Sequence, residues 1–165
     1  MLKKNNPIFS ILFVCAVNTT RSPALKGVMQ SLLKDKGLER EVDVESAGLQ
    51  PFCLGSPPDE KMQKIAHSHG VVIHDHSKLF ESAYFGQFNA IFCVNKDIVS
   101  AIRQMARTEE EAQKVFIATE FSAENPMQDI PYPDYNNIDA VEDIWTQILD
   151  ACLGIYYHFL KIKQQ

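Results

Sequence analysis

The fold is decided by the stretch Ile11-Leu-Phe-Val-Cys-Ala-Val-Asn-Thr-Thr-Arg-Ser-Pro23. The nearly continuous apolar run of residues 8–14 predicts a short buried parallel strand. A helix is expected at once afterwards, because Ser22 can cap it, Pro23 can lie in its first turn and Gly37 can end it. A loop between a strand and a helix start presents backbone N–H groups and a positive dipole end. These are the elements of a phosphate-binding loop.

Cys15 and Arg21 bracket this loop. A guanidinium group matches two phosphate oxygens, and a cysteine thiolate in such an electropositive loop is a nucleophile. The stretch therefore predicts an anion site in which Cys15 attacks phosphorus. Two other interpretations are an inert core cysteine in a chance C-x5-R pattern, and a signal peptide formed by Lys3, Lys4 and the apolar residues 8–17. The strand before the loop and the Ser-Pro pair after it favour the phosphate loop, and no small-residue cleavage site follows.

Length and composition indicate one ordinary globular domain, residues 1–165. With 16 Lys and Arg against 21 Asp and Glu, the net charge is −5, so nucleic acid is not expected as a partner. No apolar run approaches the roughly 20 residues of a membrane span. The four cysteines form neither a zinc pattern nor a compact disulfide framework, so we expect no metal and a reducing compartment, the cytoplasm. The oligomeric state stays open.

Further strands and helices alternate along the rest of the chain. Strands are predicted at residues 42–48, 88–94 and 115–118, and helices at 97–107 and from 138 to 160. Another helix is expected to open with Ser56 as its cap, and Thr108 to begin a capping box. Prolines exclude regular structure from 119–137. The sequence therefore predicts an α/β fold: a single doubly wound domain with a four-stranded parallel sheet, helices on both faces and a phosphate loop after the first strand.

The loop Cys15-Ala-Val-Asn-Thr-Thr-Arg-Ser-Pro23 resembles the active-site loop of low-molecular-weight protein tyrosine phosphatases, written C-x-G-N-x-C-R-S-P. The resemblance covers nearly the whole chain, in the family's order, and continues through Ser46-Ala-Gly48, Gly55-Ser-Pro-Pro-Asp59, His69-Gly70, residues 88–93 and Ile130-Pro-Tyr-Pro-Asp134. The chain departs from the pattern at Val17, where the family has Gly, and at Thr20, where it commonly has a second Cys. Val17 is expected either to keep a negative φ or to distort the loop.

The resemblance implies hydrolysis of phosphate monoesters, protein phosphotyrosine or small aryl phosphates, through a phosphocysteine and without a cofactor. Cys15 is then the nucleophile, and Arg21 stabilises the phosphate together with the loop residues Ala16, Val17, Asn18, Thr19, Thr20 and Ser22. By the same resemblance, the Ser22 hydroxyl bonds the thiolate, and Asn18 holds the loop's shape with Ser46 and His76. Phe52 and Tyr135 form walls for an aromatic ring.

The general acid is the least regular feature of the resemblance. Where the family reads Asp-Pro-Tyr, this chain reads Tyr132-Pro133-Asp134. A phenol with an ordinary pKa near ~10 is a weak proton donor at neutral pH. We therefore expect Asp134 to donate the proton while Tyr132 lines the cleft, with Asp129 as the second choice.

Three alternatives remain from the sequence. Val17 and the altered acid loop favour a catalytically impaired module that binds phosphate or phosphotyrosine. A thiol-dependent arsenate reductase can share the loop, but it needs further cysteines to resolve its intermediate. A metal site at His74 and His76 lacks the ligands that would complete it.

Overall fold

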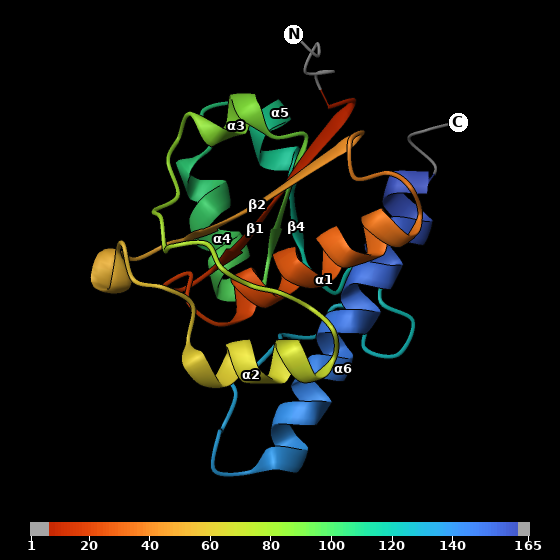
Figure 1. The fold of residues 1–165 in the computed structure, drawn as a ribbon. Helices are drawn as coiled ribbons and strands as arrows, with labels where there is room; N and C mark the ends of the chain where they lie inside the picture. The colour runs from red at the N-terminus through yellow and green to blue at the C-terminus, as the bar shows by residue number, and fades with distance from the viewer. Residues whose placement is uncertain (1–6, 162–165) are drawn as a thin grey trace, which may run out of the picture.

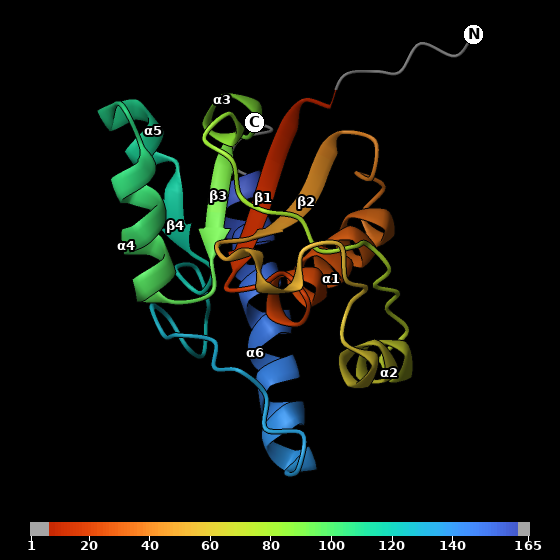
Figure 2. The same cartoon turned by 90° about the vertical axis from the view of Figure 1, so that its left-hand side faces the viewer.

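Four parallel strands form one sheet in the order β2-β1-β3-β4 in the computed structural model, which describes residues 7–161 (Figures 1 and 2). The strands are β1 (Phe9–Cys15), β2 (Val42–Gly48), β3 (Ala90–Cys93) and β4 (Val115–Ile117). Strand β1 pairs with β2 on one side and with β3 on the other. Because β1 is central, its residues 11–14 are fully buried, which explains their unbroken apolar run.

Helices cover both faces of the sheet. α1 and α6 pack on one face with α2 beside them, and α4 and α5 lie on the opposite side (Figure 2). The helices are α1 (Arg21–Asp35), α2 (Glu60–Ser68), α3 (Tyr84–Gln87), α4 (Lys96–Met105), α5 (Glu109–Gln113) and α6 (Ile138–Ile155), with the short turns η1 (Pro51–Cys53) and η2 (Tyr156–Leu160). The predicted α/β fold is confirmed.

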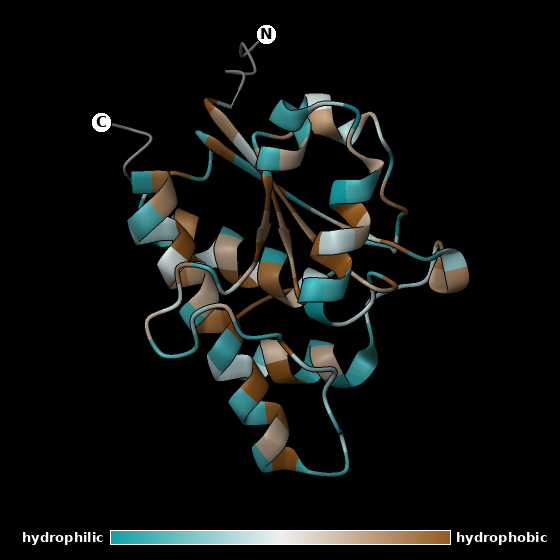
Figure 3. Cartoon of the chain, turned by 180° about the vertical axis from the view of Figure 1, so that it is seen from behind, coloured by the Kyte–Doolittle hydropathy of each residue, from teal (hydrophilic) through white to brown (hydrophobic). Residues whose placement is uncertain are grey.

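The hydrophobic core lies between the sheet and its helices. Figure 3 shows the central strands as hydrophobic. Trp145 and Cys152 of α6 belong to the same core, and both are almost fully buried. Within residues 7–161, we find no helix with both the length and the apolar character that crossing a membrane requires.

Strand order reverses at β1, and this reversal positions the loop that follows it. The chain passes from β1 to β2 on one side of the sheet and then returns to β3 on the other. The connections after β1 and β3 therefore diverge at the carboxyl ends of the strands, where doubly wound proteins bind their ligands. Gly48 at the end of β2 lets the loop lie close: a Cβ there would be 2.9 Å from the Val17 carbonyl carbon and 3.0 Å from the Asn18 nitrogen.

Both helix caps expected at serine residues are wrong. α1 begins at Arg21, its N-cap Thr20 makes no side-chain capping bond, and the Ser22 hydroxyl is engaged inside the loop instead. α2 is capped by Asp59, whose Oδ1 accepts from the backbone nitrogens of Lys61 and Met62. For α2 the reason is that a residue preceding proline avoids the helical conformation, so the Pro57-Pro58 pair delays the start of this helix.

The remaining elements follow the predictions closely. Thr108 caps α5 by accepting a hydrogen bond from the Glu111 nitrogen. In a capping box the Glu111 carboxylate would accept from the Thr108 nitrogen, but here it accepts from the nitrogen of the preceding residue, Arg107. No helix or strand interrupts residues 118–137. The four-residue helix α3 was not predicted, because one helical turn is too short to show a hydrophobic period.

Candidate active site

The Cys15 sulfur lies at the carboxyl end of β1 beneath the loop. The residue is 2% exposed, and its Sγ is 2.9 Å from the Ser22 Oγ. The backbone nitrogen of Asn18 donates a hydrogen bond to the same sulfur at 3.3 Å. An amide donor and a hydroxyl therefore converge on Sγ, the atom that the resemblance makes the nucleophile. The contact between Ser22 and Cys15 is the one that the family resemblance implies.

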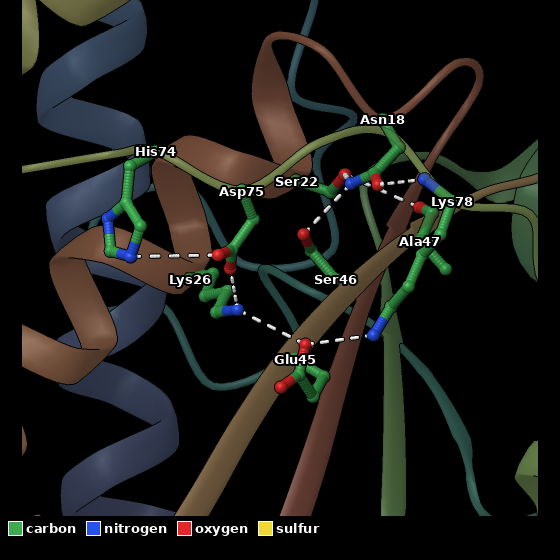
Figure 4. Close-up of polar contacts among 9 residues, drawn as sticks. All are labelled: Asn18, Ser22, Lys26, Glu45, Ser46, Ala47, His74, Asp75 and Lys78. Carbon is green, nitrogen blue, oxygen red and sulfur yellow. Dashed lines mark hydrogen bonds and ion pairs between the residues drawn. The ribbon is translucent and has the colours of Figure 1, made fainter. Parts of the chain in front are cut away.

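Asn18 holds the loop in a conformation that most residues avoid. Its φ is 58°, in the left-handed region that Asn tolerates better than most non-glycine residues. Its Nδ2 donates to the hydroxyls of Ser22 (2.9 Å) and Ser46 (2.8 Å), and its Oδ1 accepts from the Lys78 nitrogen at 3.0 Å (Figure 4). The side chain thus joins α1, β2 and the segment before Leu79.

Val17 is compatible with this loop. Because Asn18 takes the left-handed conformation, Val17 keeps a negative φ, which is the first of the two expected outcomes. Its carbonyl oxygen accepts a hydrogen bond from the Ser77 hydroxyl at 2.8 Å. The backbone N–H groups of residues 16, 17 and 19–22 have no acceptor within residues 7–161. Unpaired amides at the start of α1 are the donors that an oxyanion needs.

Arg21 connects the loop to the long segment between β4 and α6. Its buried guanidinium donates from one terminal nitrogen to the Ile130 carbonyl oxygen at 2.9 Å. The guanidinium carbon lies 5.8 Å from the centre of the Tyr132 ring. A guanidinium carries five N–H donors, so this anchoring leaves others available for an anion. Tyr132 therefore lies beside Arg21, and its role in lining the cleft stays a prediction.

Tyr135 directly follows Tyr132-Pro133-Asp134, the stretch with the predicted acid, and it lies near the start of α2. Its ring is nearly perpendicular to that of Tyr132, with 6.5 Å between the ring centres. Its hydroxyl is buried close to the Asp59 carboxylate and to Thr20. Burial, followed by the Asp59 charge, holds the pKa of Tyr135 well above its usual range, so the phenol stays protonated. Asp59 in turn donates its backbone N–H to the Thr19 carbonyl oxygen at 2.8 Å.

The two candidate acids differ in what they contact. Asp134 is exposed, and its Oδ1 accepts a hydrogen bond from the Asn136 nitrogen at 3.0 Å in a local turn. The Asp129 carboxylate accepts from the Lys96 nitrogen at 2.9 Å, which ties it to the beginning of α4. Asp129 is therefore tied to α4, whereas the bond of Asp134 lies within its own turn. Asp134 stays the predicted acid.

Two of the predicted residues lie away from the loop contacts. His76 is exposed and takes no part in holding Asn18 within the described part of the chain, so its supporting role is corrected. The backbone nitrogen of Lys78 bonds Asn18 instead, and the Ser77 hydroxyl bonds the carbonyl oxygen of the neighbouring Val17. Ser77 is buried, whereas His74 and His76 are exposed. Phe52 on η1 is 80% exposed and has no ring partner among residues 7–161, so its role as a cleft wall stays a prediction.

The other cysteines do not supply the partners that an arsenate reductase would need. Cys93 and Cys152 are fully buried, and burial raises the pKa of both thiols far above the usual range. Cys53 lies half-buried on η1 as a free thiol. Within residues 7–161, no group of three or more His, Cys, Asp or Glu side chains is placed to hold a metal ion. The pair His74 and His76 therefore gains no further ligands.

A family model described as low molecular weight phosphotyrosine protein phosphatase matches residues 10–165. The chain is also 31% identical, over 144 residues, to low molecular weight phosphotyrosine protein phosphatase 2 of Drosophila melanogaster, with 87% of each protein covered. The chain belongs to the low molecular weight phosphotyrosine protein phosphatase family.

Further members of this phosphatase family resemble the chain over almost its whole length. The Streptomyces coelicolor low molecular weight protein-tyrosine-phosphatase is 25% identical over 149 residues, covering 89% of this chain and 91% of that protein. The crystal structure of a protein tyrosine phosphatase from Entamoeba histolytica, with Hepes in the active site, superimposes with a TM-score of 0.87. It is 26% identical and covers 94% of this chain and 99% of that one.

Several groups that hold the phosphatase loop escaped the sequence analysis. They are the backbone nitrogen of Lys78, the Ile130 carbonyl oxygen and the Ser77 hydroxyl. Backbone groups are present in every residue and leave no signal in a sequence. Ser77 could have been found only by asking which residue of the 71–78 segment turns inward beside the buried Ile73.

Replacing Asn18 separates the two parts of its role. Asn18→Gly keeps the left-handed conformation but loses the side-chain hydrogen bonds, each of which contributes about 1 kcal/mol. Asn18→Ala loses the same bonds and also places a Cβ in the left-handed region, at a cost of about 1 kcal/mol. We expect the free energy of unfolding in urea to decrease from wild type to the Gly variant and again to the Ala variant. Equal stability of the two variants would show that the conformation of residue 18 does not matter.

Proposed function

We propose that this family member hydrolyses phosphate monoesters, with protein phosphotyrosine as the substrate class, through a phosphocysteine formed on Cys15. The observation that carries the proposal is the surroundings of the sulfur. Cys15 Sγ accepts a hydrogen bond from the Asn18 backbone nitrogen at 3.3 Å and lies 2.9 Å from the Ser22 hydroxyl. The other backbone N–H groups of this loop have no acceptor in the described part of the chain. A nucleophile and an oxyanion site are thus built from one loop.

The reaction proceeds in two displacements. Cys15 Sγ attacks phosphorus, the S–P bond forms and the ester P–O bond breaks, while Asp134 gives its proton to the leaving oxygen. Water then attacks the phosphocysteine, the S–P bond breaks, and the Asp134 carboxylate takes up the proton that the water loses. Inorganic phosphate leaves, and Cys15 returns as the thiolate. The Ser22 hydroxyl stabilises this thiolate when sulfur leaves phosphorus in the second displacement.

Charge on the transferring phosphoryl group is stabilised by the loop. Arg21 faces the equatorial oxygens with the donors not used on Ile130. The backbone amides of residues 16, 17 and 19–22 supply the remaining hydrogen bonds at the positive end of α1. Preorganisation matters here, because donors that need not move during the reaction stabilise the transition state most.

Aromatic residues at the loop rim support an aryl ester as the substrate. Tyr132 is 56% exposed and its ring lies near the Arg21 guanidinium, while Tyr135 closes the same side. Phe52 presents an exposed ring on η1. An aromatic leaving group can pack against such rings, whereas an alkyl phosphate makes fewer contacts. The relatives' names point to phosphotyrosine proteins as the source of this ester.

The cytoplasm is the proposed location. All four cysteines are free thiols, and a nucleophilic thiolate keeps its activity only where thiols stay reduced.

The first test replaces the nucleophile. Cys15→Ser should abolish hydrolysis of an aryl phosphate and leave inorganic phosphate binding measurable by calorimetry, because a serine hydroxyl stays protonated and attacks poorly. The matched control is Cys53→Ser, which changes a thiol outside the loop and should keep full turnover. Turnover by purified Cys15→Ser at the wild-type rate would exclude the mechanism.

The second test concerns the acid. Asp134→Asn should slow an aryl phosphate with a poor leaving group by about 10²–10⁴ and an activated one far less, because only the poor leaving group needs the proton. Asp143→Asn, which removes an exposed carboxylate from α6, serves as the control. Small, equal effects of Asp134→Asn on both substrates would exclude it as the acid and favour a module that binds phosphotyrosine without efficient turnover.

A further inference from the structure

Three segments that are distant in sequence each supply one partner to the Asn18 side chain. They are α1 through Ser22, β2 through Ser46, and the segment 73–78 through the Lys78 nitrogen. The same three segments are joined a second time by charged side chains (Figure 4). This second set of contacts consists of Lys26, Glu45, Asp75 and Lys78, and we name it the charged tier.

Three residues of the charged tier are close in the chain to the groups that contact Asn18, or carry one of those groups. Lys26 lies one turn after Ser22 on α1, and Glu45 directly precedes Ser46 on β2. Lys78 carries both functions, because its backbone nitrogen bonds Asn18 and its Nζ bonds Glu45 Oε2 at 2.9 Å. Glu45 Oε2 also accepts from Lys26 Nζ at 3.1 Å, so one carboxylate oxygen bridges two ammonium groups.

Asp75 completes the charged tier from the irregular segment. Its carboxylate forms a hydrogen-bonded ion pair with Lys26 Nζ, and His74 Nε2 lies 3.6 Å from its other oxygen. Residues 72–76 make no backbone hydrogen bond to any part of the described chain. The ion pair between Asp75 and Lys26 is therefore the main polar contact between residues 72–76 and α1. Close packing adds to it, since a Cβ on Gly27 would meet the Ile73 side chain at 2.6 Å.

Lys26 is the residue that makes this arrangement unusual. Its side chain is only 9% exposed, although a buried ammonium without partners is strongly unfavourable. Burial opposes the charge of Lys26, but Asp75 and Glu45 outweigh it and raise the pKa of its ammonium. Burial likewise opposes the charges of Glu45 and Asp75, and their lysine partners still lower the pKa of both carboxyls. Lys26, Glu45 and Asp75 are therefore charged at neutral pH.

We propose that the charged tier is a positioning device of the phosphatase: Lys26, Glu45, Asp75 and Lys78 fix the distances between the three segments that hold Asn18, and thereby the shape of the phosphate loop. The proposal rests on the proposed function of that loop. Glu45 is its central residue, because it is bonded to both lysines. Among the described residues, the Cys15 sulfur is bonded by Asn18 and Ser22 and by none of the four side chains, so they act on catalysis through the segments that hold Asn18.

A purely stabilising role would have a different consequence. Ion pairs that only stabilise the fold would lower the melting temperature when broken and leave the folded enzyme's phosphate affinity unchanged. A positioning role changes both the affinity and kcat in the folded enzyme, because a displaced Asn18 moves the loop amides and the donor to Cys15 Sγ. Small displacements of catalytic groups can reduce rates by up to ~10²-fold.

The test compares Glu45→Gln with Asp43→Asn. Asp43 lies on the same strand and the same face as Glu45, two residues earlier, and its exposed carboxylate has no ion-pair partner among residues 7–161. For each protein, folded at the assay temperature by circular dichroism, the Kd for inorganic phosphate and the kcat for an aryl phosphate are measured. We expect Glu45→Gln to raise the Kd and lower kcat, each about tenfold, and Asp43→Asn to match the wild type.

The outcome that overturns the proposal is a Glu45→Gln enzyme with wild-type Kd and kcat and only a lowered melting temperature. If Glu45→Gln does not fold, Lys78→Met replaces it, because that side chain is 41% exposed and its loss leaves the Lys26 pairs intact. Lys78→Met should show the same two changes, and wild-type values for it would equally overturn the proposal. Absence of phosphate binding in the wild type would instead contradict the proposed function, so the two failures are distinguishable.

Discussion

The left-handed conformation of Asn18 is the constraint on which the site depends. A chain leaving the carboxyl end of β1 must turn sharply to bring the start of α1 back over Cys15, and one residue with φ of 58° makes that turn. Such a conformation is unfavourable for an L-residue unless its surroundings stabilise it. Here the amide side chain of the same residue supplies that stabilisation, because it is bonded to α1, β2 and the segment that precedes Leu79.

This constraint explains several features that would otherwise look unrelated. Val17 can replace a glycine because the strained torsion belongs to its neighbour, and Gly48 is needed because the turn lies directly against β2. Ser22 is available to the thiolate because it is not used as a helix cap. Arg21, held by the Ile130 carbonyl, brings the β4–α6 segment with Tyr132 to the rim of the same loop. The residues that carry out the chemistry and the residues that contact the substrate are thus positioned by the same loop.

The fold could be predicted from the sequence because burial leaves periodic traces. The run ending in Val14, the helical spacing on α1 and the wide apolar stripe around Trp145 each mark a buried surface. The loop was found because its residue types carry chemistry. Partners of the loop were harder to find: the backbone of Lys78 replaces the expected ring of His76, and a pair of prolines moved the cap of α2 from Ser56 to Asp59. Such choices depend on which side chains turn inward, and that is settled only by packing.

The central claim is that Cys15 carries the phosphoryl group between the two displacements. Rapid acid quenching of the enzyme during turnover of a phosphorus-labelled aryl phosphate, followed by peptide mapping, tests it most directly. The mechanism predicts that the label is on the peptide containing Cys15 and that it appears within the first turnover. The label should persist longer in Asp134→Asn, because the Asp134 carboxylate takes up the proton from the attacking water. Label on another residue, or none during steady turnover of a substrate the enzyme demonstrably hydrolyses, would contradict it.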